Sequence, residues 1–260
     1  MSIILELITS YTFSQVPYIT YDALDAYAED VLRDAMPEAL NSLCPVDAER
    51  FVEFYLGLDV LFKCLSYDRQ ILGMTAFNAG YVQVLDELTG VSEPMFVEAG
   101  TVIIEPSLTL KRNIQRRRFT YLHEGSHWLL HRKAFSADNP YGDVGKYENQ
   151  YLAAKEGRID YSRCQKERDD SERMERQADF LASAILMPRP ALRMAYRDFF
   201  KFYGEKPREI IRGVDGLDDC FAAQLPEYIG KIFNVSKRAA LIRLEKLGAI
   251  VDKQKRGFSP

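Results

Sequence analysis

The sequence predicts an α+β protein, with a small, mostly antiparallel sheet near the middle of the chain and helices before and after it. Three observations support this fold class. Apolar residues recur at helical spacing over residues 21–40 and 171–188. Between residues 58 and 105 the pattern changes to short β-branched and aromatic runs separated by Asp, Asn and Gly. All three histidines of the chain lie within residues 123–131, inside an apolar stretch typical of a buried helix.

Composition places the chain among ordinary globular proteins. Its 260 residues are 47% hydrophobic, which is enough to bury the core of one large or two small domains. The net charge of −4 argues against a dedicated nucleic-acid-binding protein, although a local basic patch remains compatible with it. Four widely spaced cysteines indicate reduced thiols rather than a disulfide framework. They are Cys44, Cys64, Cys164 and Cys220.

The N-terminal residues and the distribution of apolar stretches indicate the cellular compartment. Residues 1–8 have no basic start, and Glu6 interrupts their apolar run, so we expect no signal peptide. No stretch of the sequence is long and apolar enough to be expected to cross a membrane. We therefore expect a cytoplasmic protein.

The N-terminal part should contain two helices followed by the strands. Residues 21–40 predict an amphipathic helix. Asp47 suits the N-cap of a second helix that runs through Tyr55, and Gly57 suits its end. Strands are expected at 58–65, 71–77, 81–85 and 101–105. An edge strand of such a sheet can hold an extended peptide by main-chain hydrogen bonds, and we expect strand 101–105 to be that edge.

The most specific motif is His123-Glu-Gly-Ser-His127. On a helix, His123 and His127 lie on one face because they are four residues apart. Two neutral imidazoles in this arrangement can bind Zn²⁺, and Glu124 beside them can accept a proton from water. The alternative is a core helix whose imidazoles bond to backbone carbonyls. It is less favoured, because it leaves the carboxylate of Glu124 buried and unpaired.

A catalytic zinc site needs a third protein ligand. No histidine follows at the spacing of a three-histidine motif, since His131 comes too early. The helix expected over 171–188, which Pro188 ends, offers carboxylates instead. Glu175 and Asp179 lie four residues apart on one face of it. One of them can bind the metal while the other accepts a hydrogen bond from a ligating histidine. The alternative for such an acidic pair is a solvated helix face.

Together, residues 118–131 and 175–188 resemble the motifs of the ImmA/IrrE metallo-endopeptidases, which are regulatory bacterial zinc proteases. The resemblance implies a zincin-like core in which His123, His127 and Glu175 bind zinc and Glu124 is the general base. Asp179 then supports a ligating histidine from behind. The family often has Leu-Gly before the second histidine, whereas this chain has Gly125-Ser126 there.

The resemblance also implies a substrate, a cytoplasmic transcriptional repressor of the helix-turn-helix type. Two alternatives from other classes remain open. One is a metalloprotease-like regulatory module that binds a partner without cutting it. The other is a DNA-binding regulator that acts through the C-terminal helices. For His131 we expect either a buried structural hydrogen bond or a part in holding the transition-state oxyanion.

For three further segments the sequence leaves alternative interpretations open. Basic residues between 111 and 118 form either a solvated face or a patch that steers an acidic substrate. The polar connection 132–170 is a lid, a binding loop or a disordered insertion. Segments 226–233 and 236–247 predict two short helices that resemble a helix-turn-helix. Residues 226–260 carry eight Lys or Arg against three Asp or Glu, so they either contact DNA or form a helical cap with exposed lysines.

These segments suggest a division into two parts. Residues 1–200 are expected to form the metallopeptidase domain. Within it, residues 1–110 hold the N-terminal helices and the sheet, and residues 111–190 hold the active-site helices. Residues 201–260 are expected to form a C-terminal helical unit.

Overall fold

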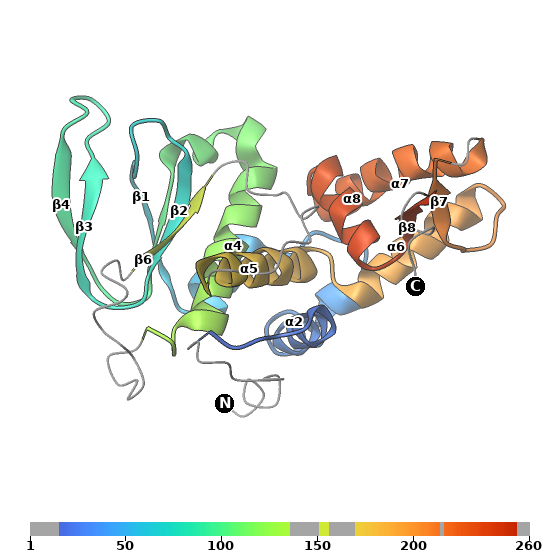
Figure 1. Ribbon diagram of the computed structural model, residues 1–260, viewed down its shortest axis with the longest axis horizontal. Helices are drawn as coiled ribbons and strands as arrows, with labels where there is room; N and C mark the ends of the chain where they lie inside the picture. Colours follow the sequence, from blue (N-terminus) through green and yellow to red (C-terminus); the bar gives the residue numbers. More distant parts are fainter. Residues whose placement is uncertain (1–15, 136–150, 156–169, 214–215, 254–260) are drawn as a thin grey trace. The chain divides into compact units, whose positions relative to one another are not determined.

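The structure is a computed structural model that describes residues 16–135, 151–155, 170–213 and 216–253, with only the backbone described for 151–155. Helices and small sheets alternate along the chain, which confirms the α+β class (Figure 1). The chain divides into a first unit, Met1–Tyr27 with Asp47–Ala182, and a second unit, Ala28–Val46 with Ser183–Pro260. The expected domain boundary at residue 200 stays a prediction, because compact units need not be separate folding domains.

Several expectations fall partly outside the described residues. These are the N-terminal residues 1–8, Cys164, most of the connection 132–170 and the end of the basic C-terminal stretch. Cys44, Cys64 and Cys220 are free thiols, as expected. Among the described helices, none is long and apolar enough to cross a membrane.

The first expected helix is interrupted by a proline. Helix α2 covers Tyr21–Ala35, and a separate 3-10 turn, η1, covers Pro37–Leu40. Met36 between them has a φ of −151° and a ψ of 67°. This conformation follows from the proline, whose ring disfavours helical geometry in the residue before it. The single helix expected over residues 21–40 is therefore wrong at its C-terminal end.

The second expected helix begins and ends as predicted. The side chain of Asp47 caps it by accepting a hydrogen bond of 3.0 Å from the backbone N–H of Arg50. Helix α3 covers Ala48–Arg50 and continues as a π-helical turn, η2, over Phe51–Tyr55. Gly57 follows with a φ of +66°, a conformation that glycine adopts without strain because it has no Cβ atom.

The sheet of the first unit has the strand order β1-β5-β2-β6. Its strands are β1 (Asp59–Phe62), β5 (Thr101–Ile104), β2 (Ile71–Ala76) and β6 (Tyr151–Lys155). Strand β2 runs antiparallel to both β5 and β6, while β1 and β5 are parallel. Strands β3 (Gly80–Leu85) and β4 (Ser92–Val97) form a separate antiparallel hairpin (Figure 1). The sheet is therefore mostly antiparallel, as expected.

Strand β5 is not an edge strand, so the expectation that residues 101–105 form the edge of the sheet is wrong. It lies between β1 and β2, and all four of its residues are buried. A strand buried on both faces has a continuous apolar run, and the segment Thr-Val-Ile-Ile fits that description better than it fits an exposed edge. The described sheet ends instead at β1 and β6. Strand β6 comes from the connection 132–170, so part of this connection belongs to the sheet.

Helix α4 (Ile114–His131) contains the three histidines and packs closely on its surroundings. A Cβ atom at Gly73 on β2 would lie 2.6 Å from Oε1 of Glu124, so only glycine leaves room for this carboxylate. A Cβ atom at Gly125 would lie 3.0 Å from Cδ1 of Leu56 and 3.1 Å from Cγ2 of Val52. The order Gly-Ser in this motif therefore matches close packing of α4 against η2.

The basic run before the histidines has two environments. Lys111 and Arg112 are exposed in the short 3-10 helix η4 (Lys111–Asn113), as expected for a solvated face. Arg117 forms an ion pair of 2.8 Å with Glu49. Arg118 is buried, and burial lowers the pKa of its guanidinium while the charges of nearby carboxylates oppose that shift. The interpretation as a solvated face therefore holds for Lys111 and Arg112 but not for Arg118.

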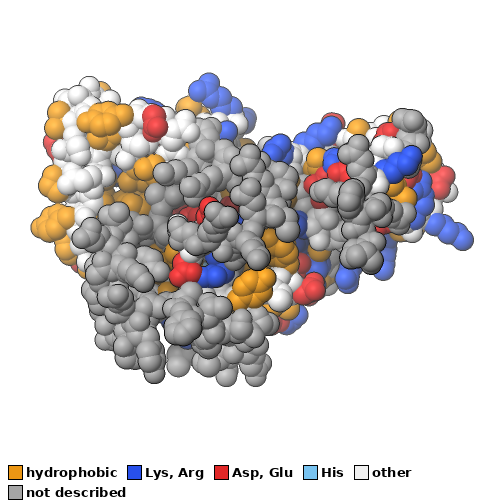
Figure 2. Space-filling model, in the orientation of Figure 1, with side chains coloured by type: hydrophobic (Ala, Val, Ile, Leu, Met, Phe, Trp, Pro, Cys, Tyr) orange, Lys and Arg blue, Asp and Glu red, His pale blue; other side chains and the backbone are white. Residues whose placement is uncertain are grey.

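The second unit consists of helices and one small parallel strand pair. Its elements after α5 (Asp170–Leu186) are α6 (Arg189–Phe202), β7 (Ile210–Arg212), α7 (Leu217–Phe233), α8 (Lys237–Lys246) and β8 (Ile250–Asp252). Strands β7 and β8 pair in parallel. Lys and Arg side chains are frequent over α6, α7 and α8 in the face shown in Figure 2.

The two C-terminal helices differ from the expectation in length. Helix α7 begins at Leu217 rather than at Pro226, which lies inside it. Asn234 ends α7 in the left-handed region with a φ of +50°, and Ser236 caps α8 by accepting a hydrogen bond of 3.1 Å from the N–H of Ala239. Arg243 of α8 is buried and donates to the backbone carbonyl of Met187. One side of α8 is thus committed to packing within this unit.

Candidate metal centre

Two histidines of α4 and one glutamate of α5 lie close enough to share a metal ion. The ligand atoms of His123, His127 and Glu175 all lie within 4.8 Å of one another. The two Nε2 atoms are 3.0 Å apart, and the Glu175 oxygens lie 3.4 Å from Nε2 of His123 and 3.6 Å from Nε2 of His127. Of the residues that the structure describes, no other group of this kind was found. Three ligand atoms therefore converge on one point.

His123 presents Nε2 to this point because Asp179 holds its other nitrogen. Nδ1 of His123 lies 2.8 Å from Oδ1 of Asp179. A carboxylate accepts hydrogen bonds, so Nδ1 carries the proton and donates it. Burial alone would lower the pKa of His123, but the hydrogen bonds and charges of Asp179 and Glu175 raise it well above its usual value. The surroundings of Nε2 therefore favour a cation, whether a proton or a metal ion.

A chain of hydrogen bonds orients His127, and it starts at the backbone of Pro17. The amide Nε2 of Gln177 lies 2.8 Å from the carbonyl oxygen of Pro17. A carbonyl oxygen only accepts, so the NH₂ end of Gln177 must face Pro17 and its oxygen must face the other way. That oxygen, Oε1, lies 3.0 Å from Nε2 of His131. His131 must therefore donate from Nε2.

The same chain decides which nitrogen of His127 carries a proton. Burial lowers the pKa of His131 to about 4, so at pH 7 its ring is neutral and has one N–H. With that proton on Nε2, Nδ1 of His131 is an acceptor, and Nδ1 of His127 at 3.1 Å must be the donor. Burial also lowers the pKa of His127 well below its usual value, so this ring is neutral too. Its remaining nitrogen, Nε2, points an unprotonated lone pair at the metal position.

This arrangement bears on the two roles expected for His131, which are a structural hydrogen bond and a part in holding the transition-state oxyanion. Both of its ring nitrogens are engaged, one by His127 and the other by Gln177. A neutral imidazole has a single N–H, and here Gln177 accepts it. The geometry supports the structural hydrogen bond over a part in holding an oxyanion.

Glu124 is fully buried, and only one of its two carboxylate oxygens has a hydrogen-bond partner among the described residues. The hydroxyl of Thr75 on β2 donates to Oε2 of Glu124 at 2.6 Å. Oε1 has no hydrogen-bond partner among the described residues. Burial raises the pKa of Glu124 to about 7, although the charge of His123 and the Thr75 hydrogen bond both oppose this shift. A buried oxygen without a partner needs a water or a ligand beside it.

Sequence reasoning missed three residues that shape this site. Gly73 and Thr75 belong to the predicted strand, but nothing in a strand pattern says which helix residue they face. A buried threonine in an apolar strand is only a weak signal of a polar partner. Gln177 lies between the predicted Glu175 and Asp179, yet its partner Pro17 is 160 residues away in the chain. Such contacts depend on the tertiary fold.

No protein-family model matches this chain, and no curated protein matches it either. The structure shows two buried imidazoles on helix α4 and one partly buried carboxylate on helix α5 that together could hold a metal ion. Nitrogen and oxygen ligands in this number suit zinc and related first-row metals.

Proposed function

We propose that this protein is a zinc-dependent endopeptidase with a zincin-like core. His123, His127 and Glu175 would bind the metal, and Glu124 would be the general base. The observation that carries the proposal is the buried Oε1 of Glu124, which has no described partner and belongs to the residue next to a ligand histidine. Burying an unpaired carboxylate costs free energy. A metal site with only a structural role would gain nothing at this place that offsets the cost.

The residues present fit a catalytic zinc site. Three protein ligands leave a fourth coordination position for water or substrate, as catalytic sites require. Both histidines offer an unprotonated or exchangeable Nε2, since Asp179 and the Gln177–His131 chain hold their Nδ1 protons. A zinc ion bound here would act as a Lewis acid that lowers the pKa of water and polarises the scissile carbonyl.

Glu124 is suited to move the proton of this reaction. Thr75 occupies Oε2, so Oε1 is the atom that takes a proton from the attacking water. The C–O bond forms, and the same oxygen then gives the proton to the leaving nitrogen as the C–N bond breaks. The products are a carboxylic acid and an amine, and Glu124 returns to its starting state. A pKa of about 7 lets the carboxyl both accept and release the proton near neutral pH.

For the substrate we propose a transcriptional repressor of the helix-turn-helix type, cut once. Two observations support this choice. The motifs around both ligand helices resemble those of regulatory proteases of this type. The described sheet ends at β1 and β6, and a free strand edge can pair with an extended segment of a protein substrate.

The test compares the wild type with Glu124→Gln. Each purified protein is analysed for bound zinc and incubated with the repressor encoded beside its gene, with and without a chelator. Intact mass measurement then identifies the products. We expect about one zinc per chain in both proteins. Cleavage should be single, chelator-sensitive and slower by roughly 100- to 10,000-fold in the variant, which is the usual contribution of a general base.

The other outcomes discriminate between the alternatives. Full cleavage by Glu124→Gln would refute the mechanism. Bound zinc without cleavage of the repressor or of an unfolded protein such as casein would favour the non-proteolytic binding module. Rapid digestion of casein would contradict the narrow specificity. Duplex DNA binding that weakens steeply with salt would favour the DNA-binding regulator.

A further inference from the structure

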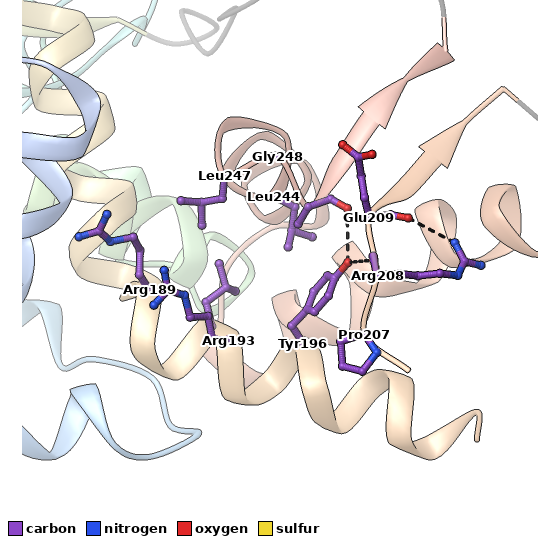
Figure 3. Close-up of a pocket in the computed structure, with 11 residues that line it drawn as sticks. Arg189, Arg193, Tyr196, Pro207, Arg208, Glu209, Leu244, Leu247 and Gly248 are labelled. Carbon is purple, nitrogen blue, oxygen red and sulfur yellow. Dashed lines mark hydrogen bonds between the residues drawn. The ribbon is translucent and has the colours of Figure 1, made fainter. Parts of the chain in front are cut away.

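The second unit contains a pocket of about 330 Å³ that has no part in the proposed metal centre. Its walls come from the first half of α6, from residues 207–209 and from the end of α8 with the residues that follow it (Figure 3). All of these segments belong to the second unit. The volume is at the lower end of the range for small-molecule sites, so a ligand of about amino-acid size would fit.

Hydrogen bonds to backbone groups hold the walls in place. The hydroxyl of Tyr196 on α6 donates to the carbonyl of Arg208 and lies 3.4 Å from that of Ala249 (Figure 3). The N–H of Ile210 donates to Ala249 at 3.0 Å and joins the same two segments. Burial raises the pKa of Tyr196 to about 12, so its hydroxyl keeps its proton. The pocket is therefore formed before any ligand arrives.

Three leucines form an apolar lining of the pocket. Leu192 comes from α6, Leu244 from α8 and Leu247 from the residue that ends α8, and all three line the cavity together with the ring of Tyr196. Figure 3 shows both Leu244 and Leu247 on the side opposite α6. A ligand with an aliphatic or aromatic body would bury it between these side chains and gain hydrophobic free energy.

One end of the pocket carries a cation that has no partner among the described residues. Arg189 donates to Glu29 at 2.8 Å, and Arg208 forms an ion pair of 2.6 Å with Asp218. Arg193 is exposed and has neither an ion pair nor a hydrogen bond from its side chain to any residue that the structure describes. In Figure 3, Arg193 lies at the same end as Arg189, while the acidic lining residue Glu209 lies at the opposite end. Of the three arginines that line the pocket, Arg193 is therefore the one without an ion pair among the described residues, and it lies away from Glu209.

We propose that this pocket binds a small amphipathic carboxylate, with its apolar body against the leucines and its carboxylate on Arg193. The guanidinium of Arg193, which has no ion pair among the described residues, matches one negative charge. Its planar pair of N–H donors matches the two oxygens of a carboxylate. The apolar walls exclude a bare inorganic anion, which would have to give up its hydration for no apolar contact. Such a carboxylate can be a free metabolite-sized acid or the C-terminal residue of a peptide.

The test is a calorimetric titration of the full chain with N-acetyl-L-leucine, N-acetyl-L-leucinamide and inorganic phosphate. We expect saturable binding of the carboxylate, with the uncharged amide weaker by about tenfold or more, since charge-assisted hydrogen bonds contribute that much. Arg193→Gln should remove this preference. Arg197→Gln is the matched control, because Arg197 is an exposed arginine one helical turn further along α6 that does not line the pocket.

A second variant tests the apolar lining without changing the charge. Leu247 lines the pocket and is partly exposed, and Leu247→Trp should fill the cavity and abolish binding of N-acetyl-L-leucine. Thermal unfolding verifies that each variant is folded. A peptide ending in leucine that binds at least tenfold more tightly than N-acetyl-L-leucine would identify a protein C-terminus as the source, and similar affinities would identify a free acid.

Several results would overturn the proposal. They are equal affinity for the carboxylate and the amide, a preference that survives Arg193→Gln, loss of binding in Arg197→Gln, and binding of phosphate alone. Absence of saturable binding by both N-acetyl-L-leucine and the peptide would also overturn it.

Discussion

Replacing His131 by Phe should weaken zinc binding although His131 is not itself a ligand. The substitution keeps a ring of similar size in a buried position but removes both ring nitrogens. Nδ1–H of His127 then loses its acceptor at 3.1 Å, and Oε1 of Gln177 loses its donor at 3.0 Å. His127 is free to move its proton to Nε2, where the proton competes with the metal for the same lone pair.

The size of the effect follows from this geometry. Zinc binding to the variant must leave the Nδ1–H of His127 buried without an acceptor. An unpartnered buried donor costs about 1–3 kcal/mol. Residues that support metal ligands from behind typically change affinity by about 10- to 100-fold, which is roughly 1.4–2.7 kcal/mol. The two estimates agree, so we expect a zinc dissociation constant raised by about 10- to 100-fold at pH 7.

Competition with a chromogenic chelator measures the zinc affinity of both proteins. The control is Leu130→Ala on the same helix, since Leu130 is buried but takes no part in the hydrogen-bond chain. That variant should lose about 2–5 kcal/mol of unfolding free energy and keep its zinc affinity within about threefold. The reasoning is refuted if His131→Phe binds zinc as tightly as the wild type, or if Leu130→Ala weakens binding equally.

The remaining predictions concern the base, the close contact beside it and a helix cap. Thr75→Val removes a hydrogen bond that favours the ionised form of Glu124, so the pKa of Glu124 should rise. The acid limb of the pH profile of kcat/KM should then move up by about one pH unit, and an unchanged limb would contradict Glu124 as the base. Gly73→Ala should keep zinc but displace the Glu124 carboxylate by roughly 1 Å and lower kcat/KM about 100-fold, whereas near-normal turnover would show that this contact relaxes elsewhere. Asp47→Ala should lower the free energy of unfolding by about 1 kcal/mol in urea titrations, because the N–H of Arg50 loses its cap; no change would mean that water replaces the carboxylate at no cost.

Features that depend on local geometry could be predicted without coordinates. Residues four apart on a helix share a face in any fold, so His123 and His127 could be paired without coordinates. The N-cap at Asp47 and the end of α5 before Pro188 depend only on neighbouring backbone groups and were predicted correctly. Pro37 is also a local signal, and it explains why the helix expected over residues 21–40 stops early.

Contacts between distant segments could not be predicted in this way, because the tertiary fold creates them. The fold is responsible for several features of the site. It brought Glu175 and Asp179 to different nitrogens of the histidine pair, and it placed Thr75 on a carboxylate 49 residues away. It also put β5 inside the sheet and β6 at its edge, because strand order depends on long-range pairing that a hydrophobic pattern does not encode. The tertiary fold also determines which nitrogen of His127 carries the proton. That position depends on the Pro17 carbonyl, which only folding brings to Gln177.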